Sequence, residues 1–152
     1  MSHLSTGDPA PDFKAKDYNG NTITMEQFRG KKVILFFYPK ANTAGCTAEA
    51  CNLRDHYQKL TDRGFVLLGV SADNETRQKN FAEKYQFPFP LIADTGKEVI
   101  RAYGAWGPKK LYGKEYEGII RKTFVISETG IIERIFDKVK TKSHAEQILE
   151  TY

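Results

Sequence analysis

The sequence predicts an α/β fold in a single domain that spans residues 1–152, with a mixed β-sheet between helical layers and a hairpin before it. Three observations support this fold class. Apolar runs typical of buried strands alternate with helical segments, which requires crossover connections and parallel strands. A late alternating segment adds antiparallel strands. The length of 152 residues and the 40% hydrophobic content suit one globular domain, and no repeat or linker divides the chain.

The first elements are a hairpin and a central strand. Residues Phe13–Met25 form the expected hairpin, because Asn19 and Gly20 lie between two short alternating runs. Residues Lys31–Tyr38 are continuously apolar after their lysines and rich in aromatic and β-branched side chains, as in a strand that is covered on both faces. Pro39 ends this strand, since proline cannot donate to a sheet ladder.

Helices and strands alternate through the rest of the chain. Apolar residues at three- and four-residue intervals predict a helix over Thr47–Arg63, which Gly64 stops. The elements expected after it are a strand at Phe65–Ala72, a helix at Asn74–Tyr85, a strand at Phe89–Asp94, a helix at Lys97–Tyr103, an antiparallel hairpin at Arg121–Phe136 and a helix to Tyr152 capped by Ser143. This order predicts the thioredoxin-like arrangement, whose reactive site lies beyond the carboxyl ends of the parallel strands.

Charge and hydropathy argue against several classes of function. The formal net charge is +4, but the lysines are dispersed among acidic residues, and the basic clusters at 107–114 and 137–142 match no binding module, so we expect no nucleic-acid partner. The longest uninterrupted apolar run, Val33–Tyr38, is far too short to span a bilayer, so we expect no membrane association. The N-terminus lacks the pattern of a signal peptide, which makes the cytoplasm the expected location.

The only two cysteines, Cys46 and Cys51, lie five residues apart at the start of the helix that follows the central strand. Free backbone N–H groups and the helix dipole at that position favour the nucleophilic thiolate over the thiol. In a regular helix, five residues separate the Cα atoms by roughly 8–9 Å, which exceeds the limit of about 7 Å for a disulfide. The pair can therefore bond only if the first turns unwind, which suits staged oxidation through a sulfenic acid.

Other uses of the two thiols are less consistent with the sequence. A zinc site needs four ligands, and only His3, His56 and His144 could join the cysteines, whose spacing of five is also wider than usual. A thioredoxin-type dithiol would need a C-x-x-C motif, which is absent. We therefore expect no metal site. The residues alone leave one alternative open, in which Cys46 is a small buried hydrophobe.

The segment PKANTAGC resembles the peroxiredoxin motif P-x-x-x-T-x-x-C through Pro39, Thr43 and Cys46. The second cysteine five residues later resembles the peroxiredoxin Q or bacterioferritin comigratory protein subfamily. The similarity also covers GDPAPDF near the start, FFYPK before the motif, LRD after Cys51, GVSAD at 69–73 and RKTFVIS at 121–127. One departure is Ala44, where the subfamily commonly has proline, and alanine leaves the loop freer by up to about 1 kcal/mol.

The resemblance implies a thioredoxin-dependent hydroperoxide reductase that serves antioxidant defence and cell redox homeostasis without a cofactor. Cys46 would be the peroxidatic cysteine, which attacks hydrogen peroxide or an organic hydroperoxide and becomes a sulfenic acid. Cys51 would be the resolving cysteine, which forms an intramolecular disulfide with it. A thioredoxin-like dithiol would restore both thiols, and a monomer suffices because both cysteines lie on one helix.

The same resemblance gives roles to four further residues. The Thr43 hydroxyl would accept from the thiol or donate to the peroxide, and Pro39 would shape and shield the pocket. Arg121 would hold its guanidinium against the thiolate and the leaving oxygen, with Glu49 orienting it. Each residue also has a structural alternative: Thr43 as a cap or turn residue, Pro39 as a strand terminator, Glu49 as an acid near a helix start and Arg121 as an exposed charge at a strand end.

Two other functions stay open at the level of the sequence. One is a general disulfide reductase of the same fold, which would act on protein disulfides and be indifferent to peroxide. The other is a non-enzymatic redox sensor, whose helix unwinds on oxidation and presents a surface to a partner. The rate of oxidation by peroxide and the turnover with a dithiol reductant distinguish these functions from a peroxidase.

Overall fold

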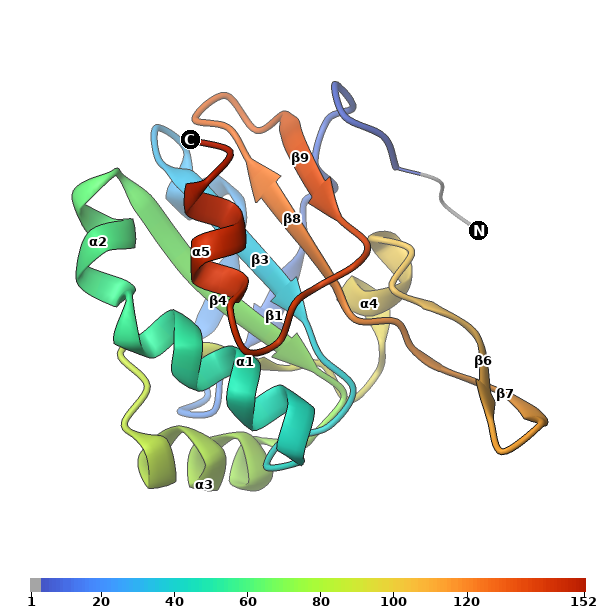
Figure 1. Cartoon of the computed structure of the whole chain (residues 1–152). Helices are drawn as coiled ribbons and strands as arrows, with labels where there is room; N and C mark the ends of the chain where they lie inside the picture. Colours follow the sequence, from blue (N-terminus) through green and yellow to red (C-terminus); the bar gives the residue numbers. More distant parts are fainter. Residues whose placement is uncertain (1–3) are drawn as a thin grey trace.

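The computed structural model describes residues 4–152, and its strands and short helices follow one another as the sequence predicts in most places (Figure 1). In chain order the elements are β1 (Lys14–Lys16), β2 (Thr22–Thr24), η1 (Glu26–Phe28), β3 (Lys32–Phe37), α1 (Ala44–Asp55), α2 (Tyr57–Asp62), β4 (Phe65–Ser71), α3 (Glu75–Tyr85), β5 (Leu91–Ala93), α4 (Glu98–Ala102), β6 (Trp106–Leu111), β7 (Lys114–Ile119), β8 (Lys122–Ile126), β9 (Ile132–Phe136) and α5 (His144–Leu149). No helix within these residues is long and apolar enough to cross a bilayer.

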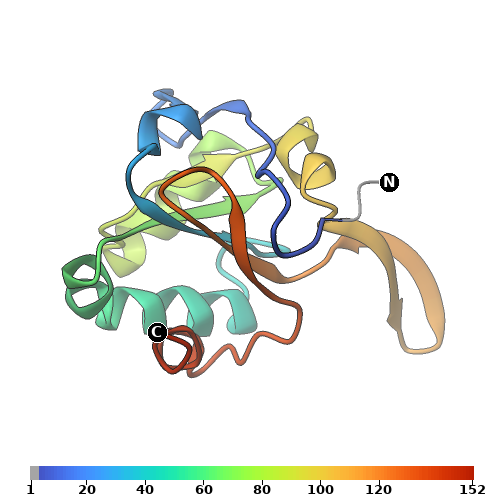
Figure 2. The same ribbon diagram turned by 90° about the horizontal axis from the view of Figure 1, so that it is seen from above.

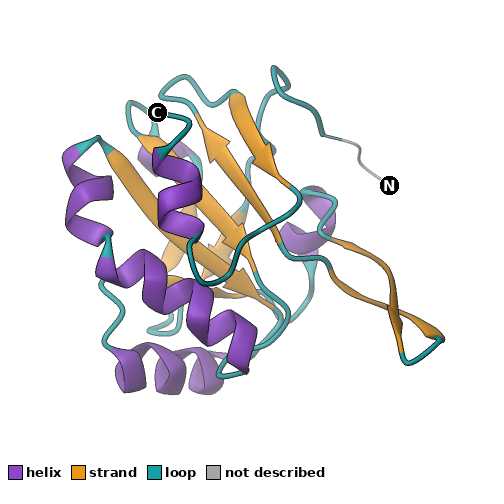
Figure 3. Cartoon of the chain, in the orientation of Figure 1, coloured by secondary structure: helices purple, strands orange, loops and turns teal. Residues whose placement is uncertain are grey.

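The central sheet is mixed, as predicted. Its five strands run in the order β5-β4-β3-β8-β9 (Figure 3). Strand β3 pairs in parallel with β4, and β4 with β5, whereas β8 is antiparallel to both β3 and β9. The N-terminal hairpin is confirmed by the antiparallel pairing of β1 with β2, with Gly20 at a φ of 79° in their connection. The parallel half of the sheet brings the carboxyl ends of β3 and β4 to one edge.

Alternate side chains of β3 enter two separate apolar layers. Ile34 and Phe36 pack with residues of α1, α2, α3 and α5, whereas Val33, Leu35 and Phe37 pack with the N-terminal hairpin and α4. Figure 2 shows α1 and α5 together on one side of the sheet and α4 on the other. Both faces of β3 are therefore covered, which explains its nearly continuous run of apolar residues.

The prediction of one helix at Thr47–Arg63 is wrong at its start and in its middle. The helix begins at Ala44, directly after Thr43 in extended conformation, so Cys46 lies inside its first turn. It is also interrupted at His56, where the backbone leaves helical geometry and a new helix, α2, begins. The His56 ring nitrogen Nδ1 lies 2.9 Å from the Asn52 carbonyl oxygen, so a side chain competes for an acceptor of the helix.

The hairpin formed by β6 and β7 is absent from the sequence prediction. Its two strands pair over six residue pairs and extend away from the body of the molecule (Figure 1). Tyr112 and Gly113 form the tight turn with φ values of 52° and 78°. Two positive φ values define a type I′ turn, which Asn-Gly usually signals and Tyr-Gly does not. Pro108 also lies inside β6, and proline argues against a strand except at a sheet edge.

The cap of the last helix comes from a different residue than predicted. Helix α5 ends at Leu149, and the Ser143 side chain makes no capping hydrogen bond. The Asn52 Oδ1 on α1 instead accepts from the Ala145 backbone N–H at 2.7 Å. The Asn52 Nδ2 also donates to Glu146 Oε1 at 2.9 Å. A tertiary contact thus replaces the local cap and fastens α5 to α1.

Candidate active site

The loop that joins β3 to α1 lies at the carboxyl end of the parallel strands and carries the first predicted site residues. Asp73, which follows β4, fixes this loop: its Oδ2 accepts from the Ala41 backbone N–H at 2.7 Å and from the Ser71 hydroxyl at 2.7 Å. Asp73 was not among the site residues predicted from the sequence. Its position could have indicated a role, because Ser71 and Asp73 are polar residues at the end of a buried strand, at the edge of the sheet where active sites lie.

Cys46 lies in the first turn of α1 with its side chain buried and a cation against its sulfur. The residue is 2% exposed, and Arg121 Nη2 lies 3.3 Å from its Sγ. The first N–H groups of a helix have no intrahelical acceptor and form the positive end of its dipole, which favours an anion there. The helix N-terminus and the guanidinium thus both place positive charge beside the Cys46 sulfur.

Arg121 lies between β7 and β8 and bridges two acidic groups of α1. Its Nη1 donates to Glu49 Oε1 at 2.6 Å while Nη2 contacts the Cys46 sulfur. Burial alone would lower the pKa of Arg121, but the charges of Cys46 and Glu49 and the hydrogen bonds to them raise it above its usual value. A Cβ on Gly45 would lie 3.3 Å from Nη2, so glycine leaves room for this approach. The guanidinium is thus a permanent cation beside the thiol.

Glu49 is 1% exposed and uses only one of its two carboxyl oxygens. Burial raises its pKa to about 7, against the lowering effect of Arg121. The second oxygen, Oε2, has no hydrogen-bond partner among residues 4–152, and His144 Nε2 lies 3.9 Å from it. The structure brings Glu49 and Arg121 together as the resemblance implies.

Replacement of Glu49 by glutamine should become relatively less destabilising as the pH rises from about 5 to 8. Burial raises the pKa of Glu49 from its ordinary value of 4.5 to about 7, so the folded state binds more protons than the unfolded state in this window. The contribution of the natural carboxyl is complete below 4.5 and is lost as the pH rises through about 7. The difference in unfolding free energy should move by up to about 1.4 kcal/mol per pH unit.

Urea denaturation of both proteins at pH 5 and pH 8 measures this change. Glu146→Gln is a matched control, because that carboxylate lies on the surface of α5 and its pKa is lowered by its hydrogen bond to Asn52. Its stability relative to the natural protein should change little between these two pH values. A gap for Glu49→Gln that is equal at pH 5 and pH 8 contradicts a buried carboxyl that titrates near neutrality.

The other two residues of the motif lie in the loop but do not contact the sulfur. Thr43 immediately precedes α1, and its hydroxyl donates to the Lys40 carbonyl at 2.8 Å instead of to Cys46 or to a helix N–H. Pro39 directly follows the buried Tyr38 and is half-buried. Thr43 and Pro39 therefore both lie in the loop between β3 and α1, called the thiol loop below, and their catalytic roles stay predictions.

Cys51 lies on the same helix as Cys46 and is a free, half-buried thiol. Burial raises its pKa, with Arg54 lowering it and Asp55 raising it further. Helix α1 is continuous between the two cysteines, so their Cα atoms are separated by roughly 8–9 Å. The folded helix thus keeps the thiols apart, as the spacing predicts.

Two further polar side chains near the thiol, Lys109 and Tyr38, were not predicted as site residues from the sequence. Lys109 on β6 donates to the Ile119 carbonyl at 2.8 Å, and burial and the charge of Arg121 lower its pKa while Cys46 opposes this. Tyr38 at the end of β3 is buried and donates to Gln78 Oε1 at 2.5 Å. Burial raises the pKa of Tyr38 well above its usual value, so the phenol is neutral. Lys109 belongs to the basic cluster at 107–114. Its position near the thiol depends on the β6–β7 hairpin, which was not predicted from the sequence.

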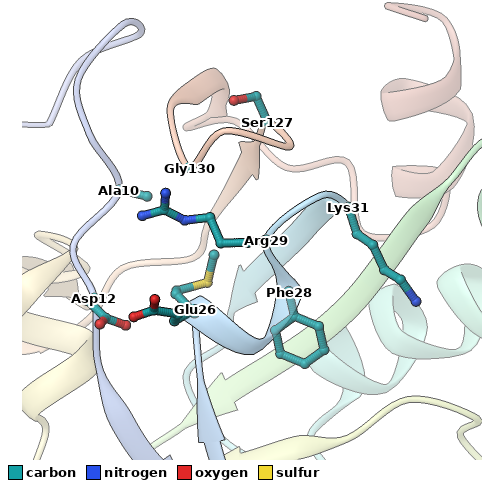
Figure 4. A pocket seen from close by; sticks show the side chains of 9 residues that line it. Ala10, Asp12, Glu26, Phe28, Arg29, Lys31, Ser127 and Gly130 are labelled. Atoms are coloured by element: carbon teal, nitrogen blue, oxygen red, sulfur yellow. The ribbon is translucent and has the colours of Figure 1, made fainter.

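A surface groove of about 440 Å³ adjoins the thiol loop. Its lining includes Thr43 and Lys40 from the loop and Arg77 and Lys84 from α3. A smaller cavity of about 30 Å³ lies at the opposite end of β3, between the N-terminal segment and the β8–β9 turn (Figure 4). Arg29 extends through it toward Ala10, whereas Lys31 points away (Figure 4). This second cavity is remote from both thiols.

The structure also bears on the metal-binding alternative. Within residues 4–152, no group of three or more histidine, cysteine, aspartate or glutamate side chains is placed to hold a metal ion. His56 instead lies 3.5 Å from Glu146, and His144 lies 2.8 Å from the Thr123 hydroxyl. His3, the remaining candidate, lies outside the described residues.

Comparisons with known proteins agree with this geometry. Residues 6–135 match the AhpC/TSA family. The chain is 42% identical over 150 residues to "Putative peroxiredoxin bcp" of Haemophilus influenzae, covering 99% of this chain and 97% of that protein. It is 41% identical over 149 residues to "Peroxiredoxin Bcp" of Escherichia coli K12, covering 98% and 96%.

A solved structure of the Xanthomonas campestris bacterioferritin comigratory protein, titled for its alkyl peroxide reduction activity, matches with a TM-score of 0.86 at 32% identity, covering 91% of this chain and 88% of that one. The predicted thioredoxin-like α/β fold is confirmed by this likeness. The resemblance carried by PKANTAGC is confirmed as well. The chain therefore belongs to the AhpC/TSA family and, within it, to the peroxiredoxins of the peroxiredoxin Q or bacterioferritin comigratory protein subfamily.

Proposed function

We propose that this peroxiredoxin reduces hydrogen peroxide and organic hydroperoxides through Cys46, that Cys51 resolves the oxidised sulfur, and that a thioredoxin-like dithiol restores both thiols. The observation that carries the proposal is the Arg121 guanidinium, 3.3 Å from the Cys46 sulfur at the first turn of α1. This cation favours the thiolate and faces the place where charge develops on the departing oxygen. Its contact with Glu49 holds it in that position.

The first chemical step is a displacement on the peroxide. The Cys46 thiolate attacks the terminal oxygen, an S–O bond forms, and the O–O bond breaks with its electron pair leaving on the alkoxide or hydroxide. That anion takes up a proton and departs as alcohol or water, and Cys46 becomes a sulfenic acid. Arg121 lowers the barrier by donating to the oxygen that gains charge, in a site largely shielded from water.

The burial of Cys46 favours a peroxidase over a general disulfide reductase. Its side chain is 2% exposed, so a folded protein disulfide has no access to the sulfur without a large movement. A hydroperoxide is far smaller than a folded protein, and a surface groove lined by Thr43 lies beside the loop that leads to Cys46. The alkyl peroxide reduction activity of the similar Xanthomonas campestris protein supports organic hydroperoxides as substrates. When peroxide binds, the Thr43 hydroxyl exchanges its hydrogen bond to the Lys40 carbonyl for one to the peroxide, and Pro39 shapes the pocket from the start of the loop.

Resolution of the sulfenic acid requires α1 to unwind near its start. The Cys51 thiol then attacks the Cys46 sulfur, an S–S bond forms, and the oxygen leaves as water. Unwinding removes Glu49 from Arg121, which breaks the 2.6 Å ion pair that holds the site together. A dithiol of the thioredoxin type completes the cycle by disulfide exchange, and the cycle as a whole acts as antioxidant defence in the cytoplasm. No second subunit is needed, so the enzyme works as a monomer.

Replacement of Cys51 by serine separates the first oxidation from the full cycle. The variant should oxidise Cys46 in a single turnover at the natural rate, because Cys51 is remote from the sulfur in the folded helix. Thioredoxin-coupled turnover should fall to background, because the disulfide that thioredoxin reduces does not form. Stopped-flow absorbance and a coupled peroxide assay measure the two rates. Unchanged coupled turnover in this variant contradicts the resolving role of Cys51.

The sensor alternative gives a different result in the same assays. A sensor oxidises at Cys46 but does not turn over when thioredoxin is supplied, whereas the proposed enzyme consumes many equivalents of peroxide. Oxidation of the natural protein no faster than that of a free thiol excludes both the enzyme and a peroxide sensor. Hydrogen exchange at residues 47–53 tests the unwinding, since it should be faster in the disulfide form than in the reduced form.

A further inference from the structure

One buried oxygen atom of the site, Glu49 Oε2, has no part in the proposed function. Glu49 Oε1 binds Arg121, but Oε2 is buried and has no hydrogen-bond partner within residues 4–152. Buried polar atoms are nearly always paired, because an unpaired one costs free energy. The ionisable side chain next to Oε2 is His144 on α5, which is fully buried, with its Nε2 at 3.9 Å. This oxygen therefore faces the imidazole behind the active site.

The hydrogen bonds of His144 fix which ring nitrogen carries the proton. The Gln147 amide donates from Nε2 to the Lys138 carbonyl at 2.8 Å, and its Oε1 accepts from the Lys140 N–H at 3.1 Å. His144 Nδ1 lies 2.9 Å from the same Oε1 and must therefore donate to it. Nε2 then carries the lone pair and accepts from the Thr123 hydroxyl at 2.8 Å. Burial lowers the pKa of His144 to about 4, so the ring is neutral.

A neutral ring of this tautomer offers no N–H donor to Glu49 Oε2, because the lone pair of its Nε2 already accepts from the Thr123 hydroxyl. A carboxylate at Oε2 therefore gains no hydrogen bond from this ring and leaves a buried charge uncompensated, whereas a protonated Oε2 buries no charge. The surroundings of Oε2 therefore favour the protonated form of Glu49. This geometric argument agrees with the raised pKa of Glu49, which burial brings to about 7.

The count of charges leads to the same protonation state. Arg121 is the cation that contacts both Cys46 and Glu49. If both were anions, two buried negative charges would share the one guanidinium that contacts them, which is unfavourable. The other groups that face the cluster are His144 from α5 and Tyr38 directly after β3, both neutral, and Lys109 from β6, a cation whose Nζ donates to the Ile119 carbonyl. A proton on Glu49 leaves one anion for Arg121.

We propose that Glu49 holds a proton on Oε2 while Cys46 is a thiolate and releases it when the sulfur becomes a neutral sulfenic acid, with His144 as the positioning residue whose neutral ring offers no donor to a carboxylate at Oε2. This inference rests on the proposed peroxidase function. Arg121 thus pairs with the thiolate before the reaction and with the Glu49 carboxylate after it. Glu49 does not protonate the leaving alkoxide directly, because its Oε1 is bonded to Arg121 and its Oε2 lies on the side of His144. The alkoxide takes its proton from water, and Glu49 returns one to the solvent.

The proposal fixes the number of protons exchanged in the first step. Without Glu49, conversion of a thiolate and hydrogen peroxide to a sulfenic acid and water takes up about one proton from the solvent for each sulfur. With Glu49, the released proton cancels this uptake, so the balance is about zero below the pH at which Glu49 ionises. The exchange of protons therefore separates a charge-switching Glu49 from one that only orients Arg121.

The experiment uses Cys51→Ser protein, so that the reaction stops at the sulfenic acid. A pH indicator in weak buffer near pH 6 reports proton uptake after one equivalent of hydrogen peroxide, and absorbance at 240 nm reports the thiolate consumed. We expect about zero protons per thiolate for this protein and about one after Glu49→Gln is added. Glu146→Gln is the matched control, because this carboxylate lies outside the cluster, and it should behave as its parent.

A second variant tests His144 itself. In His144→Gln, an amide NH₂ placed near the Nε2 position donates to Oε2 and favours the carboxylate, so Glu49 should ionise at a pH lower by about 1 unit or more. Proton uptake should then appear at pH 6, although Arg121 and Glu49 are intact. Equal uptake with and without Glu49 overturns the inference, and so does an unchanged pH dependence in His144→Gln. Absence of any fast thiolate loss instead overturns the proposed peroxidase function.

Discussion

Cys46→Ser is expected to reduce peroxide consumption to the background rate. A serine hydroxyl at this position is not ionised near neutral pH, so neither the helix N-terminus nor Arg121 can make it a nucleophile toward peroxide. Peroxide remaining after incubation with thioredoxin and its reductase measures the loss. The fold should be retained, because serine differs from cysteine by one atom at a position that is 2% exposed.

Cys51→Ser is the matched control for this loss, since it removes the other thiol of the same helix. It should keep the first oxidation that Cys46→Ser abolishes. Persistent peroxide reduction in folded Cys46→Ser protein contradicts the assignment of Cys46 as the nucleophile. Loss of the first oxidation in Cys51→Ser but not in Cys46→Ser would reverse the two assigned roles.

Arg121→Lys is expected to slow the oxidation of Cys46 by about 10²- to 10³-fold. The guanidinium contacts the Cys46 sulfur at 3.3 Å and Glu49 Oε1 at 2.6 Å with two different nitrogens. A lysine ammonium is a single point charge and cannot reproduce this fork, so it loses one partner or the other. The second-order rate constant from stopped-flow absorbance measures the effect at a fixed pH.

Arg134→Lys is the control for the loss of a guanidinium elsewhere in the chain. Arg134 lies on β9, where its Nη2 donates to the Thr151 carbonyl at 3.4 Å, away from the thiols. Its rate constant should stay within a few-fold of the natural value. If Arg121→Lys is equally mild, the arginine does not stabilise the charge that develops during the reaction.

The regular elements of the fold could be predicted because their residues carry local signals. The apolar run that becomes β3 and the hairpin of β1 and β2 were correct in kind and close in extent. The β6–β7 hairpin could not be predicted, because its Tyr112-Gly113 turn and Pro108 contradict the usual sequence signals. At the break between α1 and α2, the His56 side chain contacts the Asn52 carbonyl. The spacing of apolar residues along the sequence does not show such a contact.

In the site as well, residues within a local motif could be predicted, whereas residues that act through tertiary contacts could not. Pro39, Thr43 and Cys46 lie within eight residues of one motif and were found from the sequence. Arg121 is 75 residues away from Cys46, and only the family resemblance linked it to the thiol. His144 behind Glu49 could not be inferred in the same way, because it acts through a tertiary contact between α5 and α1 that has no local signature.

The central claim is that peroxide reacts first at Cys46 and that Cys51 captures the product. Natural protein mixed with one equivalent of hydrogen peroxide, trapped at successive times from milliseconds and mapped by peptide mass spectrometry, tests it most directly. The account predicts oxidation of Cys46 to a sulfenic acid at the earliest times, followed by a disulfide with Cys51 within the same chain. Oxidation that begins at Cys51, or that reaches Cys46 no faster than a free thiol, contradicts it.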